Sequence, residues 1–182
     1  MSVSSWMSWE GGVDLAGMTA EGLEGPNVIV HLARMVSTPV GSAPSGMLLY
    51  QPDPKRAPLV MGFISSDEKV GPWFGPHVFA GTPFAEAPFL KAQIRVGYLD
   101  GVATSRVEAG GHVFEVTLGG LGPLEVVDRP VGALPFRQQG LEAVAKTVTL
   151  KVDGTAVELV VPRVGLSGGP AAVWAPAGIY AR

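Results

Sequence analysis

The three histidines, His31, His77 and His112, are the side chains best suited to acid–base or metal chemistry. A catalytic zinc or iron site uses three histidines, or two and a carboxylate. No two of these histidines lie within four residues of each other, and the chain has no cysteine. We therefore predict no metal site and no cofactor, and a convergence of the three histidines through the fold stays open.

His77 lies in an unusually aromatic stretch. Five of the seven phenylalanines fall between Phe63 and Phe89, and Trp73 joins them. A segment this apolar is costly to leave in water, so it is expected to cover a pocket or a partner surface. The residues that we predict to bind a ligand are Trp73, Phe74, His77, Phe79 and Phe84.

Three functions remain open for this stretch. The first is the binding of a small apolar or aromatic molecule in a pocket walled by residues 71–89. The second is a structural homo-oligomer that uses the stretch as its interface. The third is an enzyme in which His77 acts as a general base with Glu115 or Glu86.

Other candidate motifs are weaker. Residues 165–169 spell Gly-Leu-Ser-Gly-Gly, which resembles the nucleophile elbow of hydrolases around Ser167, but an all-β chain lacks the strand–turn–helix setting that this motif needs. Lys91 could form a Schiff base only if buried, and the pattern of its strand places it outside.

The elements that position these residues are mainly strands. Asp100-Gly101 and Gly110-Gly111 each predict a two-residue hairpin turn. Both turns give strand registers that place the same group of mainly apolar residues on one face, so residues 90–118 are predicted to form a three-stranded meander. The predicted inner face holds Ile94, Val96, Tyr98, Val107, Phe114, Val116 and Leu118. The predicted outer face carries Arg95, Arg106 and Glu115 side by side, as a salt-bridge cluster or a contact for an anion or a subunit.

Asp153-Gly154 predicts a further hairpin over residues 147–161. The spacing of Leu141, Val144 and Ala145 predicts a single helix over 138–146. The chain is thus predicted to be all-β with about one short helix, folded as an antiparallel β-barrel or a curled β-sandwich, with the barrel preferred because it hides sheet edges.

Composition sets the remaining expectations. The chain has 182 residues, 47% of them hydrophobic and only 16% charged, with a net charge of −3. These values favour one domain over residues 27–182, preceded by an N-terminal arm over 1–26, and a homo-oligomer. Without basic runs, a signal peptide or a long apolar run, we expect no nucleic-acid partner, no membrane partner and a cytoplasmic location.

Overall fold

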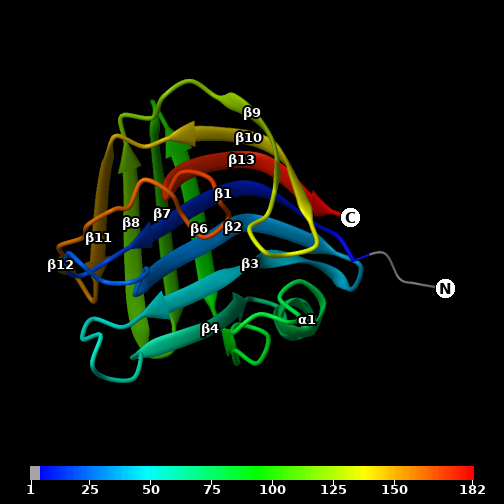
Figure 1. The fold of residues 1–182 in the computed structure, drawn as a ribbon, viewed down its shortest axis with the longest axis horizontal. Coiled ribbons are helices and arrows are strands. Elements are labelled where there is room, and N and C mark those ends of the chain that lie inside the picture. Colours follow the sequence, from blue (N-terminus) through cyan, green and yellow to red (C-terminus); the bar gives the residue numbers. More distant parts are fainter. Residues whose placement is uncertain (1–4) are drawn as a thin grey trace.

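The computed structural model describes residues 5–182, and the first four residues of the expected arm lie outside the described range. The fold is all-β with one short helix, as predicted, but its strands form two open sheets and not a closed barrel. The first sheet has the strand order β5-β4-β3-β2-β1-β13-β10-β9, and the second has the order β12-β11-β8-β7-β6. Strands of the second sheet run across those of the first (Figure 1).

The first sheet contains both ends of the described chain. It is formed by β1 (Met7–Gly17), β2 (Val28–Thr38), β3 (Gly41–Tyr50), β4 (Val60–Ser65), β5 (Phe89–Lys91), β9 (Glu125–Pro130), β10 (Arg137–Val144) and β13 (Ala172–Ala181). The second is formed by β6 (Gln93–Leu99), β7 (Val102–Ala109), β8 (His112–Gly119), β11 (Thr147–Val152) and β12 (Thr155–Val157). The helix α1 (Val70–His77) follows β4.

The predicted register of the meander is confirmed, but the meander begins at Gln93 and not at residue 90, because β5 pairs with β4 in the first sheet. Ile94 pairs with Val107, and Val107 pairs in turn with Phe114, as the two turns require. Asp100 and Gly101 both have positive φ, as do Gly110 and Gly111, which is the backbone that a type I′ turn needs. The second predicted hairpin also pairs as expected, with Val152 opposite Thr155.

Besides the preference for a barrel, two sequence expectations are wrong. Residues 7–17 do not belong to a separate arm, because β1 pairs with β2 on one side and with β13 on the other, inside the first sheet. Residues 138–146 are mostly strand β10, not a helix. A bulge between Leu141 and Ala143 breaks the alternation there, so the apolar spacing imitates a helical one.

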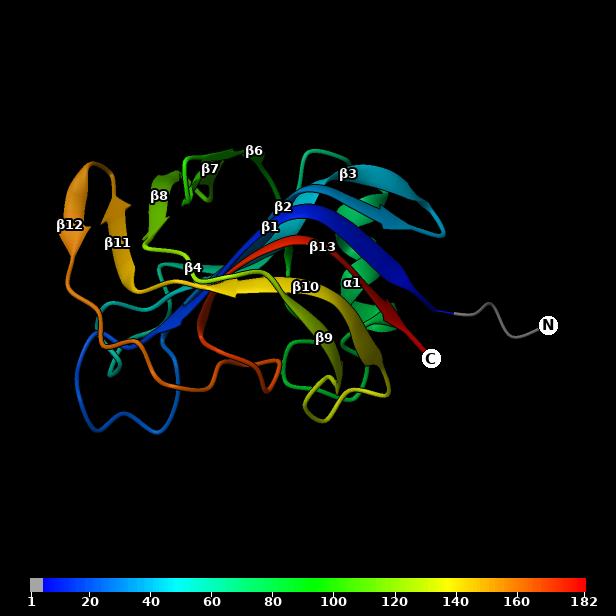
Figure 2. The ribbon, with the colours of Figure 1, turned by 90° about the horizontal axis from the view of Figure 1, so that it is seen from above.

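The first sheet has a hydrophobic core on each face. One core lies between the two sheets and is mainly aliphatic, with Val13, Leu15, Val107 and Leu118 essentially inaccessible to solvent. The other core is richer in aromatic side chains and is covered by α1 and by loops. Figure 2 shows the second sheet on one side of the first sheet and the loops on the other.

Interruptions in neighbouring strands determine which side chains reach the second core. Gly11 has a φ of +65° in β1, and the pairing of β2 with β3 shifts between Ala33 and Val36 at the same level. An irregularity of this kind moves following residues to the other face of a strand. As a result both Trp9 and Asp14 face the aromatic core, although an odd number of positions separates them.

Candidate functional site: a cavity on the aromatic face of the first sheet

A half-open cavity of about 290 Å³ lies on the aromatic face of the first sheet. Strands β1, β2, β3, β4 and β13 supply one wall, through residues that include Trp9, Ala33, Met47, Phe63 and Tyr180. The other wall consists of α1 and three loops, covering residues 79–84, 131–134 and 166–167. Most of these lining side chains are aliphatic or aromatic, so the cavity is mainly apolar.

Helix α1 begins where a carboxylate caps it. The Asp67 side chain accepts hydrogen bonds from the backbone N–H groups of Lys69 and Val70, at 2.7 and 3.0 Å. Pro72 lies in the first turn, where its missing N–H is not needed. Pro76 lies inside the helix, where it lacks an N–H to donate, and the helix ends one residue later at His77. This short helix directs Phe74 to the cavity.

The aromatic residues predicted to bind a ligand divide into two groups. Phe74, Phe79 and Phe84 line the cavity. Trp73 is 7% exposed and packs in the aromatic core without lining the cavity. His77 is exposed at the end of α1, where its ring stacks on the indole of Trp73 at a centroid distance of 5.1 Å.

Glu115 and Glu86 lie away from the cavity lining. Glu115 is on the outer face of the second sheet, with its carboxylate 3.8 Å from Arg106, which also bonds Glu108. Glu86 is exposed in the loop that follows α1. The expected pairing of His77 with one of these carboxylates does not occur in the geometry of the described residues.

The three histidines do not converge. His31 lines the cavity from β2, and His112 lies at the β7–β8 turn, where its Nδ1 is 2.7 Å from the Asp153 carboxylate. Within residues 5–182 no cluster of three or more histidine, aspartate or glutamate side chains is arranged to hold a metal ion. Lys91 is exposed and its ammonium donates to Glu68 at 3.0 Å.

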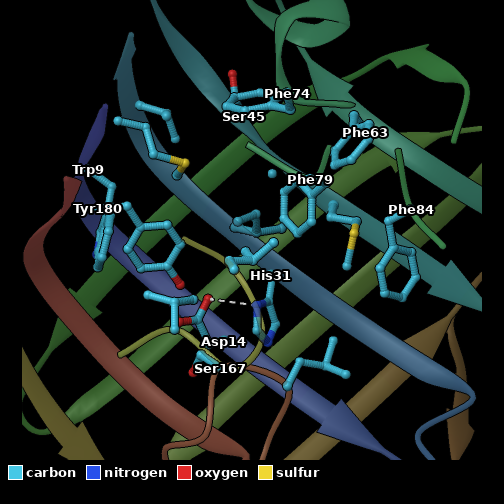
Figure 3. A pocket seen from close by; sticks show the side chains of 18 of the residues that line it. Trp9, Asp14, His31, Ser45, Phe63, Phe74, Phe79, Phe84, Ser167 and Tyr180 are labelled. Carbon is cyan, nitrogen blue, oxygen red and sulfur yellow. Dashed lines mark ion pairs between the residues drawn. The ribbon is translucent and has the colours of Figure 1, made fainter. Parts of the chain in front are cut away.

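The titratable side chains of the cavity gather at one end, which sequence reasoning did not identify as a unit, whereas the hydroxyls of Ser45 and Thr82 line it elsewhere and are hydrogen-bonded within the chain. Asp14 from β1 is opposite His31 from β2, with 3.8 Å between the carboxylate Oδ1 and the imidazole Nδ1. The hydroxyl of Tyr180, from β13, is directed to the same end, and Ser167 lies beside it (Figure 3). We call Asp14, His31 and Tyr180 the polar end.

Burial controls the electrostatics of the polar end. It raises the pKa of Asp14 above its ordinary value, and the nearby His31 opposes that rise only in part. Burial also raises the pKa of the Tyr180 phenol, with the Asp14 carboxylate adding to the effect. Both shifts have the same cause, since a poorly solvated site disfavours negative charge.

A buried ion pair lies behind the polar end. Arg129 donates two hydrogen bonds to the carboxylate of Glu142, at 3.0 and 2.6 Å, and Gln138 donates a third at 2.8 Å. Glu142 is 5% exposed, so this pairing is what allows a carboxylate there. The Arg129 guanidinium packs against Gly169, where any side chain would collide with it.

Comparisons with known proteins add little to this geometry. No family model matches the chain, and no curated protein matches it either. Among solved structures, the crystal structure of acetoacetate decarboxylase from Legionella pneumophila subsp. pneumophila str. Philadelphia 1 is similar with a TM-score of 0.38 and 8% identity, over 98% of this chain and 83% of that chain. A similarity this weak does not indicate a shared activity.

No helix in the described part of the chain is both long enough and apolar enough to cross a membrane.

Proposed function

We propose that this protein binds a small, mainly apolar molecule in the cavity between the first sheet and the cover formed by α1 and its neighbouring loops. The observation that supports the proposal is the cavity itself, about 290 Å³, with mainly apolar walls and its titratable groups at one end. Sites for small molecules generally have this composition, and 290 Å³ is at the lower limit of their usual volumes. The ligand is therefore small.

The size of the space argues against a simple packing defect. Protein interiors contain few voids larger than a water molecule, because each lost contact costs dispersion energy. Here the aromatic rings of Phe79 and Phe84 line the cavity from the segment after α1 without filling it, with Phe79 near the middle of the lining side chains and Phe84 to one side (Figure 3). A molecule in the cavity would restore the missing contacts.

The test uses N-phenyl-1-naphthylamine, an uncharged dye whose fluorescence rises in apolar surroundings. The wild-type protein is expected to enhance its fluorescence in a saturable manner. Ala33 lines the cavity from β2 and is 4% exposed, so Ala33→Met should weaken and Ala33→Phe should abolish the enhancement by filling the space. Ala177→Phe, at an exposed position of β13, is the matched control and should bind dye like the wild type.

Thermal melts of all three variants accompany the titrations, and a loss of binding is interpreted only for a variant that is folded at the temperature of the titration. The milder Ala33→Met keeps the test decisive where Ala33→Phe unfolds. A wild-type protein that gives no saturable enhancement contradicts the proposal. So does equal binding by the Ala33 variants and the control.

A second candidate function is acid–base catalysis, and the observation that favours it is the Asp14–His31 pair inside an apolar cavity. A carboxylate of raised pKa beside an imidazole can remove a proton from carbon and return it. The test is the exchange of the methyl protons of 2-acetonaphthone for deuterium in D₂O, in which the base takes a proton and solvent supplies the deuteron. This candidate is rejected if the wild-type protein exchanges the protons no faster than buffer alone, or if His31→Gln exchanges them as fast as the wild type.

A further inference from the structure

We infer that the polar end selects a ligand whose polar group is a neutral oxygen, a hydroxyl or a carbonyl, and that it discriminates against carboxylates. This inference rests on the proposed binding function and specifies the chemistry of its ligand. Three observations carry it: the gap between Asp14 and His31, the direction of the Tyr180 hydroxyl and the distribution of charge around the cavity.

The gap leaves hydrogen-bonding capacity unused. The 3.8 Å between Asp14 Oδ1 and His31 Nδ1 exceeds the range of a hydrogen bond, so neither group satisfies the other directly. Their side chains are 27% and 24% exposed, and both line the cavity. A ligand hydroxyl placed between them could accept from one group and donate to the other, and a carbonyl oxygen there could accept a hydrogen bond.

Tyr180 supplies a third hydrogen-bonding group from the opposite side. Its ring packs edge-on against Trp9, with 5.1 Å between centroids, which fixes the direction of the hydroxyl. Trp9 in turn lies against Gly178, where a Cβ would come within 2.1 Å of the indole. The hydroxyl is therefore held in place toward Asp14 and His31 (Figure 3).

The charges disfavour an anionic ligand. No lysine or arginine lines the cavity within the described residues, and His31, the one side chain there that can become cationic, already faces Asp14. Arg129 is close enough to lower the pKa of Asp14, but both terminal nitrogens of its guanidinium already donate to the Glu142 carboxylate. A carboxylate in the cavity would lose its hydration without gaining a cation and would meet Asp14.

A cationic ligand is also disfavoured. An ammonium group would lose its hydration on entering the mainly apolar cavity, and Asp14 is the one carboxylate lining it, among residues 5–182, that could compensate the charge. It would compete with His31 for the same carboxylate and would be repelled whenever that imidazole is protonated. A ligand with a neutral oxygen needs no charged partner and is not repelled by a protonated His31.

The experiment compares four ligands with one naphthalene body by isothermal titration calorimetry at pH 7. They are naphthalene, 2-naphthalenemethanol, 2-naphthoate and 2-naphthylmethylamine. The alcohol is expected to bind at least about 10-fold more tightly than either charged ligand and about 5-fold more tightly than naphthalene, which corresponds to a net gain of one or two hydrogen bonds.

Two variants identify the groups responsible. Tyr180→Phe should reduce the affinity for the alcohol about 5-fold and leave naphthalene, the matched control, unchanged. Asp14→Asn should bring the affinity for 2-naphthoate closer to that for the alcohol, because it removes the opposing carboxylate. A merely structural role for Tyr180 would move the affinities for naphthalene and alcohol together, and that result would contradict the inference.

The outcomes separate the two proposals. Equal or tighter binding of 2-naphthoate or 2-naphthylmethylamine overturns this inference and leaves the proposed apolar binding function standing. Equal binding of naphthalene and the alcohol shows that the polar end contributes nothing and also overturns it. Failure of all four ligands to bind contradicts both proposals.

Discussion

The two faces of the first sheet are closed in different ways. On one face the second sheet covers it, and aliphatic side chains from both sheets fill the space between them. On the other face a helix of eight residues and three loops form the cover, and the buried rings of Trp9, Phe63, Trp73 and Phe74 pack there. The cavity is found on this second face.

This difference explains why the cavity lies on the face that is covered by a helix and loops. Two sheets present regular rows of side chains that interdigitate closely, and the depression found beside this core, at Tyr50, Val152 and Val157, is more open than the cavity. A short helix and loops present side chains at irregular intervals, and bulky rings cannot fill every gap between them. The first face therefore contributes stability, and the second can contribute binding.

The largest expected effect is a break in the packed face. Phe114 is 1% exposed and packs edge-on against Tyr50, with 5.6 Å between ring centroids. Phe114→Asp places a carboxylate there without a partner, at a cost of about 5 kcal/mol or more, which is comparable to the whole stability of a domain. We expect little or no soluble folded protein, measured by soluble yield and circular dichroism.

The control is the neighbouring residue on the opposite face of β8. Glu115 points outward beside Arg106, so Glu115→Lys should cost less than about 1 kcal/mol and give normal soluble yield. Comparable tolerance of the two changes would contradict the assignment of inner and outer faces.

The next effect tests the aromatic face away from the cavity. Trp73 is buried against Phe74, with 6.0 Å between ring centroids, and does not line the cavity. Trp73→Ala should lower the free energy of unfolding by about 3–5 kcal/mol, as for other buried aromatic residues. Chemical denaturation measures this loss, and the affinity of the remaining folded protein for N-phenyl-1-naphthylamine should change less than about 2-fold. A stable variant with lost affinity would show instead that Trp73 is a ligand contact.

Phe84 should behave in the opposite way. Its ring is only partly buried and lines the cavity from the loop after α1. Phe84→Ala is expected to cost about 1 kcal/mol of stability, because the wild-type ring leaves part of its surface in water. The same variant should weaken dye binding about 10-fold by removing one side of the site. Denaturation and fluorescence titration on both variants therefore separate core from cavity wall, and a reversed pattern would contradict the comparison.

Local signals explain how much of the fold could be predicted. The meander was predictable because Asp100-Gly101 and Gly110-Gly111 specify backbones with positive φ, which fix the register of the strands on either side. Strand β10 was not predictable in this way. Its bulge at Glu142 places two buried residues in succession, a pattern that no simple period describes.

The polar end could not be predicted because it is assembled by pairing between distant segments. Asp14 meets His31 across the β1–β2 pairing. Tyr180 lies on β13 opposite Met7, and its long side chain extends from there toward Asp14 (Figure 3). Nothing near residue 14 in the sequence indicates either partner. The one local signal was His31, which with Arg34 interrupts the apolar run 28–36, and it indicated a candidate without its function.

The smallest expected effect compares a carboxylate from each region. Asp14 is in the cavity, where burial raises its pKa, and Asp153 is at a hairpin turn of the second sheet, where hydrogen bonds from His112 and from the Val113 N–H lower its pKa. The folded state therefore binds Asp14's proton more tightly than the unfolded state does, and binds Asp153's proton less tightly. The contribution of Asp14 to stability therefore falls as the pH rises above about 3.8. The contribution of Asp153 is present above that pH and is lost as the pH falls through its lowered pKa.

Thermal melts between pH 3 and pH 7 should then show Asp14→Asn gaining stability relative to the wild type with rising pH, and Asp153→Asn losing it. Parallel curves for the two variants would contradict the assignment of a poorly solvated cavity to one face and a solvated hairpin to the other.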